Sequence, residues 1–325
     1  MTTSTSAAPA SAVAAPGPSR VRSKRRARRR ETSSALMFLT PWIIGFAVFT
    51  AWPLGYAAYL SLTDYDVIND PSFVGWDNYA ELFSDPKVAL ALGNTLWFAV
   101  VQVPTLVVVA LALALLLNSV GRRSSGFFRT VFFLPKMTPP VAVGILFLLL
   151  FNGQNGLINS ALGLAGIDGP AWTTDPEWVK PGLVIMSLWT VGSTVIILLA
   201  ALQNVPEELY ESARIDGAGF WRQSLSVTLP MISPALFFVI VVNTIGALQT
   251  FDEAYTAFFG AGNTTYSNDA ALFYVIYLFQ QAFEFLHMGY AAAMAWVLFA
   301  VIMVITAVQL IVSRRLVYYE GEDRR

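Results

Sequence analysis

The residues best suited to specific polar chemistry form a short stretch between two long apolar segments. Glu207, Glu208 and Glu211 are followed by Asp216 and Gly217. No GxxxxGK[ST] phosphate loop, no HExxH metal motif and no workable Ser/His/Asp set accompanies these carboxylates. The stretch therefore predicts a polar helix-turn unit on which a soluble partner docks, and not a catalytic centre.

The composition is that of a polytopic membrane protein. Of the 325 residues, 56% are hydrophobic and 13% are charged, which is too apolar for a soluble protein of this size. The chain has no cysteine and one histidine, His287, so a cysteine nucleophile, disulfides and thiolate or multi-histidine metal sites are excluded. We therefore expect neither an enzyme nor a metal or cofactor bound by this chain.

Six segments are long and apolar enough to cross a bilayer, which needs about 20 such residues per helix. Helices satisfy all backbone hydrogen bonds within lipid, so the predicted fold class is an all-α polytopic membrane protein with six transmembrane helices. The spans are predicted at about 35–62, 92–118, 130–151, 181–203, 231–251 and 289–313.

Basic residues predict the orientation of these spans. Eight of the twenty Lys and Arg residues lie in 20–30, and six spans place seventeen of the twenty on one side, with Lys87 and Lys180 on the other. Because positive charge favours the cytoplasm, both termini are predicted to be cytoplasmic. A seventh crossing at 270–286 would put the four C-terminal arginines outside, so this stretch is predicted as an outer interfacial or re-entrant helix.

Both ends of the chain are polar tails. Residues 1–33 are rich in Ala, Ser, Thr and Pro before the basic cluster, and this composition predicts disorder. The cluster is expected to contact anionic lipid, in preference to nucleic acid. A cleaved signal peptide is disfavoured because the apolar segment that follows is too long. The tail 319–325 closes the chain.

The loop 204–229 carries its own helix signals. Asn204 is a capping residue, Pro206 suits a first helical turn, and Gly217 is a natural stop. A second short helix follows at Phe220 and Trp221. Apolar groups exposed in this way fit a cleft on another protein, although an amphipathic helix lying on the membrane surface remains an alternative.

One motif in this loop resembles that of a known family. Glu211-Ser212-Ala213, then Gly217 and Val227-Thr228-Leu229-Pro230, resemble the EAA motif of permease subunits in bacterial binding-protein-dependent ABC importers. Ser212 and Val227 depart mildly from the family's Ala and Ile. The similarity extends over about 35–318 and is closest to the MalF/UgpA-like carbohydrate branch. Further agreement lies at 73–79, 128–135, 156–159, 251–255 and 289–293, whereas 259–263 lacks the usual Gly-Gly-Pro turn.

The resemblance implies a fold, a location and partners. The permease domain, 34–318, would have the type I importer (MetI-like) fold in the multi-pass bacterial cell membrane. Partners would be a second homologous permease as a heterodimer, an ABC ATPase dimer that binds ATP and Mg, an extracytoplasmic solute-binding lipoprotein, a sugar and the lipid bilayer. The residues that would form the ATPase-coupling element are Glu207, Glu211, Ala213, Asp216, Gly217 and Ala218.

The translocation path is expected to be neutral and polar. Asp252 and Glu253 fall at the outer end of the fifth span and Lys136 near the inner end of the third, so no titratable group is expected in the central spans. This absence favours energy from a separate ATPase over ion coupling. The resemblance to the maltose permease implies sugar contacts on spans four and five. The candidate path residues are Trp189, Ser193, Thr194, Asn243, Gly246, Ala247 and Thr250.

Three alternatives remain open. An ABC permease for glycerol phosphate or another polyol-like solute would favour Lys or Arg along the path. An ion-coupled secondary transporter would require an intramembrane carboxylate. A non-transporting receptor or scaffold would need no combination of outer-loop and inner-loop motifs.

Overall fold

The computed structural model describes residues 36–119, 122–259 and 269–317. The predicted tails 1–33 and 319–325 therefore lie outside the described residues. The chain divides into two compact units, one ending at Tyr59 and one beginning at Leu60. Helices dominate both, and the described residues contain a single pair of short antiparallel strands, β1 (Thr63–Asp64) and β2 (Ser72–Phe73).

The described part of the first unit is one long helix. It forms most of the candidate span Leu36–Leu60, within which a π-helical segment, η1 (Ala47–Ala51), precedes α2 (Trp52–Leu60). None of the apolar window of this span is buried. A helix that is apolar on all sides and exposed is stable only where its surroundings are also apolar, as in lipid.

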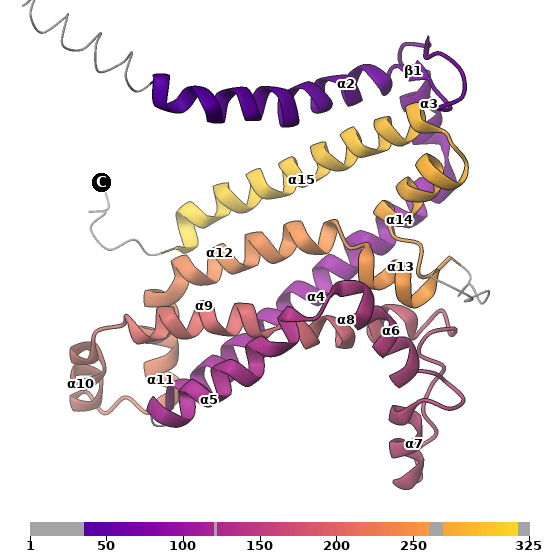
Figure 1. The fold of residues 1–325 in the computed structure, drawn as a ribbon. Helices are drawn as coiled ribbons and strands as arrows, with labels where there is room; N and C mark the ends of the chain where they lie inside the picture. The colour runs from indigo at the N-terminus through magenta and orange to yellow at the C-terminus, as the bar shows by residue number, and fades with distance from the viewer. Residues whose placement is uncertain (1–35, 120–121, 260–268, 318–325) are drawn as a thin grey trace, which may run out of the picture. The chain divides into compact units, whose positions relative to one another are not determined.

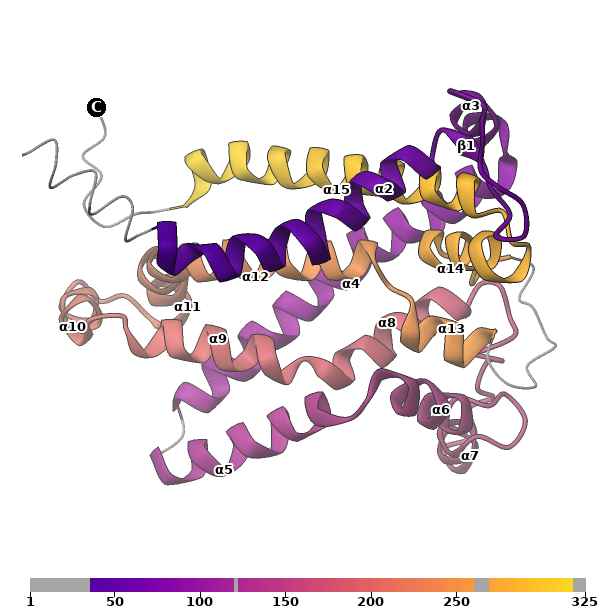
Figure 2. The ribbon, with the colours of Figure 1, turned by 45° about the horizontal axis from the view of Figure 1, so that its top comes forward.

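The second unit holds the remaining helices, and Figure 1 and Figure 2 show their arrangement. Within this unit α10 and α11 lie at one end, whereas α3, α13 and α14 lie at the other. The α-helices are α3 (Asp77–Ser84), α4 (Pro86–Ser119), α5 (Arg122–Phe133), α6 (Pro140–Leu150), α7 (Leu157–Leu164), α8 (Val179–Ser187), α9 (Gly192–Gln203), α10 (Glu207–Ile215), α11 (Phe220–Gln223), α12 (Leu229–Leu248), α13 (Asp252–Phe258), α14 (Tyr274–Phe279) and α15 (Met288–Leu316). Short 3₁₀ or π segments are η2 (Leu134–Met137), η3 (Leu188–Thr190), η4 (Ser224–Thr228) and η5 (Gln280–Glu284).

The core of the second unit is built around α4. This helix packs against both α9 and α12, and α9 and α12 also pack against each other. Ala91, Ala110 and Ala114 of α4 are fully buried, as are Val195 and Leu198 of α9. Small side chains let membrane helices approach closely, because lipid provides no hydrophobic driving force between them.

Within the described residues, four helices are long and apolar enough to cross a membrane, or up to six segments if each of two bent pairs counts as one span. The long ones are Leu36–Leu60, Pro86–Ser119, Phe220–Leu248 and Met288–Arg315. The bent pairs are Gly126–Met137 with Pro140–Leu150, at 95°, and Val179–Thr190 with Gly192–Gln203, at 54°. The predicted spans 130–151 and 181–203 therefore each contain a sharp bend.

Proline explains the first bend. Thr138 and Pro139 have extended ψ values of 129° and 138°, and Pro140 then starts α6. Proline lacks the amide N–H and pushes the preceding residue out of the helical region. Two consecutive prolines therefore stop the helix that ends at Met137 and turn the chain before the next one.

A close helix contact accompanies the second bend. A Cβ added at Gly192 would fall on the carbonyl oxygen of Phe132, so only glycine allows α9 to begin against that backbone. The 3₁₀ turn Leu188–Thr190 precedes this contact. The bend thus combines a change of helix type with a position where no side chain fits.

The stretch 270–286 also differs from a simple surface helix. Its helical part is α14 followed by η5, and it does not meet the criteria for a span. Tyr274 and Ile276 are fully buried, and the backbone N–H of Tyr274 donates to Thr95 Oγ1 at 2.9 Å. The segment is therefore anchored to α4.

Candidate functional site

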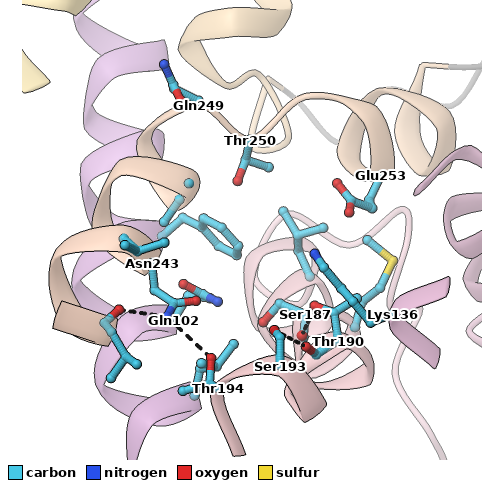
Figure 3. A pocket seen from close by; sticks show the side chains of 18 of the residues that line it. Gln102, Lys136, Ser187, Thr190, Ser193, Thr194, Asn243, Gln249, Thr250 and Glu253 are labelled. Atoms are coloured by element: carbon cyan, nitrogen blue, oxygen red, sulfur yellow. Dashed lines mark hydrogen bonds between the residues drawn. The ribbon is translucent and has the colours of Figure 1, made fainter. Parts of the chain in front are cut away.

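A cavity of about 530 Å³ opens among the central helices of the second unit. Its walls come from α4, α8, α9 and α12, with η2 and the start of α13 at its edge. Figure 3 shows hydroxyl, amide and charged side chains around this space. A concave site with a few placed polar groups is typical of small-molecule binding.

Six of the seven candidate path residues lie on the wall of this cavity: Ser193, Thr194, Asn243, Gly246, Ala247 and Thr250. Trp189 does not. Its ring packs edge-on against Phe147 at a centroid distance of 6.2 Å, and 39% of the side chain is exposed. Trp189 belongs to the 3₁₀ turn Leu188–Thr190 at the bend.

Asn243 connects two helices, α12 and α9, within one wall of the cavity. Its Nδ2 atom donates to Val239 O at 2.7 Å and lies 3.4 Å from Thr194 Oγ1. Thr194 is 3% exposed, whereas Asn243 is half-buried. The amide oxygen of Asn243 accepts none of these bonds, so it is available to a hydroxyl donor.

The opposite wall carries three hydroxyls in succession. Ser187 Oγ donates to Val184 O at 2.7 Å, Thr190 Oγ1 to Ser187 O at 3.1 Å and Ser193 Oγ to Thr190 O at 3.4 Å. A hydroxyl has one donor and two acceptor sites, and these donors point back to the helix. The wall therefore offers oxygen lone pairs to the cavity.

Charged groups also line the cavity, contrary to the expectation of a neutral path. Lys136, Asp252 and Glu253 are all part of the wall. Lys136 is predicted near the inner end of the third span, and the structure places it beside the cavity, just before the 95° bend. Asp252 and Glu253 start α13 instead of ending the fifth span. Among the described residues, Lys136 forms no ion pair within 4.0 Å.

Gln102 is a cavity residue that was not among the candidates. It lies on α4, is 7% exposed and lines the wall. Its side-chain oxygen has no hydrogen-bond partner among the described residues. A lone polar residue in an apolar helix gives no sequence signal about which way it faces, so only the packing of α4 identifies it.

The loop 204–229, named the coupling loop for the role expected from its sequence, lies at the other end of the second unit from α13 (Figure 1). The expected cap differs, because Asn204 ends α9 and Pro206 occupies the N-cap of α10 without a side-chain hydrogen bond. Glu207 and Glu208 lie in the first helical turn, where they interact favourably with the helix dipole. Gly217 follows α10 and has a φ of 72°, a conformation that favours glycine.

The coupling loop exposes large apolar groups. Ile215 is 87% exposed, Trp221 77%, Phe220 63% and Leu225 63%. Internal bonds nevertheless hold its shape, because Tyr210 Oη lies 3.0 Å from Thr228 Oγ1 and Gln223 Nε2 donates to Ala218 O at 2.6 Å. The loop is thus an ordered apolar projection. Of the six coupling candidates, Glu207, Glu211, Asp216 and Gly217 are exposed, and Ala213 and Ala218 are half-buried.

Comparison with known proteins identifies the family. Residues 106–318 match the family described as "Binding-protein-dependent transport system inner membrane component". The chain belongs to this family. The matched segment includes the whole coupling loop and most of the cavity wall.

Individual relatives cover almost the whole of this permease. The probable ABC transporter permease protein YesP of Bacillus subtilis (strain 168) is 37% identical, over 92% of this chain and 96% of that protein. The lactose transport system permease protein LacF of Rhizobium radiobacter is 36% identical, over 86% and 93%. A chain from the crystal structure of a bacterial alginate ABC transporter, in complex with an alginate pentasaccharide-bound periplasmic protein, is 25% identical with a TM-score of 0.75, over 89% and 96%.

Asp85 links three helices at the end of the second unit that lies opposite the coupling loop. Asp85 Oδ2 accepts hydrogen bonds from Tyr277 Oη at 2.6 Å and Tyr290 Oη at 3.0 Å, and Oδ1 accepts one from Lys87 N at 2.8 Å. Burial raises the pKa of Asp85, but these hydrogen bonds outweigh it and hold the pKa below its ordinary value. Asp85 therefore joins the start of α4 to α14 and α15.

Metal binding has no obvious candidate in the described part of the chain. Residues 36–119, 122–259 and 269–317 contain no group of three or more His, Cys, Asp or Glu side chains that could hold a metal ion.

Proposed function

We propose that this permease forms half of the translocation path of an ATP-driven importer for a carbohydrate, whether a mono-, di- or oligosaccharide. The observation that carries the proposal is the cavity among α4, α9 and α12, whose walls combine hydroxyl and amide groups with aromatic faces. Sugars need both kinds of contact. Lactose and alginate in the names of similar proteins support the same substrate class.

We propose six spans, with each bent pair counted once and with both termini in the cytoplasm of a bacterial cell. The seventeen basic residues that this topology places inside support it. The coupling loop, between the fourth and fifth spans, would then face the cytoplasm, and the Asp85 contacts would face outward. Lipid would cover the exposed apolar side chains of the spans.

The energy for transport would enter through the coupling loop. Its apolar projection and its carboxylates, including Glu211, would fit a cleft on a cytosolic ATPase dimer that binds ATP and Mg²⁺. A second, homologous permease would complete the path, and an extracytoplasmic solute-binding protein would deliver the sugar. Movement of the coupling helices would reach the cavity through α9, which directly precedes the loop and supplies Thr194.

A permease for glycerol phosphate is the second candidate, and Lys136 is the observation that favours it. The same cavity holds Asp252 and Glu253, so its formal charge is one positive against two negative groups, or −1. A phosphate ester with about two negative charges would be repelled by that balance. The charges therefore favour a neutral sugar over a phosphate ester.

The proposal is tested by deleting the gene for this chain and measuring uptake of labelled lactose, maltose, cellobiose, xylobiose and glycerol 3-phosphate. We expect uptake of at least one sugar to be lost and to be restored by the wild-type gene. Unchanged uptake of every sugar would contradict the carbohydrate assignment. Selective loss of glycerol 3-phosphate uptake would favour the second candidate.

A further inference from the structure

Gln102 is a buried polar side chain whose oxygen has no hydrogen-bond partner among the described residues. Gln102 lies on α4 and is 7% exposed, and its Oε1 atom is buried. Buried polar side chains in native proteins are nearly always hydrogen-bonded, so an orphaned acceptor calls for a partner that is absent from the chain itself.

The position of Gln102 indicates where that partner lies. The side chain lines the cavity, and in Figure 3 it lies on the same side as Asn243 and Thr194. Asn243 and Thr194 already bond to each other across two helices. Gln102 therefore adds a third helix, α4, to the polar wall.

A second orphaned glutamine provides a comparison. Gln309 on α15 also has an amide oxygen without a partner, but its Nε2 atom donates to Thr244 Oγ1 at 2.9 Å and it does not line the cavity. Gln309 joins α15 to α12. Gln102 forms no such hydrogen bond to another helix among the described residues.

The chemistry of the amide limits the class of ligand. A glutamine amide carries an acceptor and two donors, and it pairs with a hydroxyl in either orientation. Phe98 and Phe238 line the same cavity and supply apolar faces for the C–H side of a sugar ring. Lys136 and Glu253, not Gln102, would be the partners of a charged group.

We propose that Gln102 is a specificity-determining residue of the transport cavity and that its amide hydrogen-bonds a hydroxyl of the carbohydrate. This inference rests on the proposed function. It assigns a role to a residue that precedes the segment matching the family, 106–318.

The test compares Gln102→Leu with Gln309→Leu in the complete transport complex reconstituted in proteoliposomes. The probe is whichever labelled disaccharide of the panel the wild-type complex takes up with ATP. Gln102→Leu is expected to lower kcat/KM for uptake about 10-fold, as for loss of one buried hydrogen bond, while Gln309→Leu changes it by less than about 2-fold. Gln102→Asn, which keeps the amide, is expected to recover part of the loss.

Thermal unfolding of the purified complex separates binding from structure. Gln102→Leu removes an orphaned buried group, so its unfolding temperature should equal or exceed that of the wild type, whereas Gln309→Leu should lower it. Failure of the wild-type complex to take up any disaccharide of the panel would overturn the carbohydrate function itself. If wild-type uptake is normal, unchanged kcat/KM in Gln102→Leu, or a lowered unfolding temperature, would overturn the role of Gln102 alone.

Discussion

Asn243 Nδ2 lies 3.4 Å from Thr194 Oγ1, so two residues separated by 49 positions form one polar wall of the cavity. The contact joins α12 to α9, and α9 is the helix that directly precedes the coupling loop. A solute bound at this wall is therefore connected through one helix to the element that we propose receives the energy of ATP.

Replacing Asn243 with leucine should weaken transport without loosening the fold. The change removes the amide that faces the cavity, and kcat/KM for uptake is expected to fall about 10-fold. Binding of the ATPase should persist, since the coupling loop is untouched. Both are measured by uptake in proteoliposomes and by co-purification of the ATPase subunits.

Thr244→Val is the matched control on the same helix. Thr244 is buried, donates to Ile240 O at 2.7 Å and accepts from Gln309, but it does not line the cavity. Its loss should lower the free energy of unfolding by about 1 kcal/mol and leave KM unchanged. Unaltered uptake in Asn243→Leu would remove Asn243 from the path.

Changes in the coupling loop should stop transport at a distance from the cavity. Glu211→Lys reverses an exposed charge, and Gly217→Trp forces a side chain into a φ of 72°, which costs about 1–2 kcal/mol for other residues. We expect both variants to reach the membrane and to lose uptake. Immunoblotting of membranes and uptake assays measure the two properties.

Gly219→Ala serves as the control for this loop. Gly219 has a negative φ of −72° and open space around an added Cβ. Alanine should therefore leave uptake within about 2-fold, since a surface change away from any contact costs little. Normal transport by both Glu211→Lys and Gly217→Trp would rule out the coupling role.

The Asp85 contacts predict a dependence of stability on acid pH. The pKa of Asp85 is lowered in the folded protein, so the stabilisation is complete above the unfolded value of about 3.9 and is lost as pH falls through the folded pKa. The contribution should thus be constant from about pH 5 to 8.

Asp85→Asn is expected to lower the free energy of unfolding by about 1 kcal/mol at neutral pH, because it weakens the bonds from Tyr277 and Tyr290. Thermal unfolding in detergent measures this loss. Tyr277→Phe should cost less in the Asp85→Asn protein than in the wild type. Equal costs in the two backgrounds would show that the 2.6 Å contact contributes nothing.

Gly192→Ala should destabilise the permease. The new methyl group would overlap the carbonyl oxygen of Phe132, and overpacking of this kind costs about 1–3 kcal/mol. Gly246→Ala is the control, since nothing lies within 4 Å of its added Cβ. Comparable thermal stability of the two variants would contradict the close approach of α9 to the Phe132 backbone.

Local signals made part of this structure predictable from sequence. The apolar length of Pro86–Ser119 and the polar run that ends at Gly217 each depend on neighbouring residues only, and the all-helical architecture follows from them. The bends were not predictable from proline alone. Pro104 and Pro234 lie inside α4 and α12 without breaking either helix.

The differences at the cavity come from long-range packing. Lys136 is predicted at one end of the third span, and next to the 95° bend it lies on the cavity wall. Trp189, a candidate from the resemblance, lies in the 3₁₀ turn Leu188–Thr190 and off the cavity wall. Gln102 is outside the candidate set because the resemblance points to spans four and five, and which way it faces depends on how α4 packs against α9 and α12.

We propose that ATP drives a sugar through this chain. The decisive measurement is uptake into proteoliposomes that contain both permeases and the ATPase dimer, with ATP inside, the solute-binding protein outside and a protonophore present or absent. We expect uptake that requires ATP and is unaffected by the protonophore. Uptake that proceeds without ATP, or that the protonophore abolishes, would contradict it.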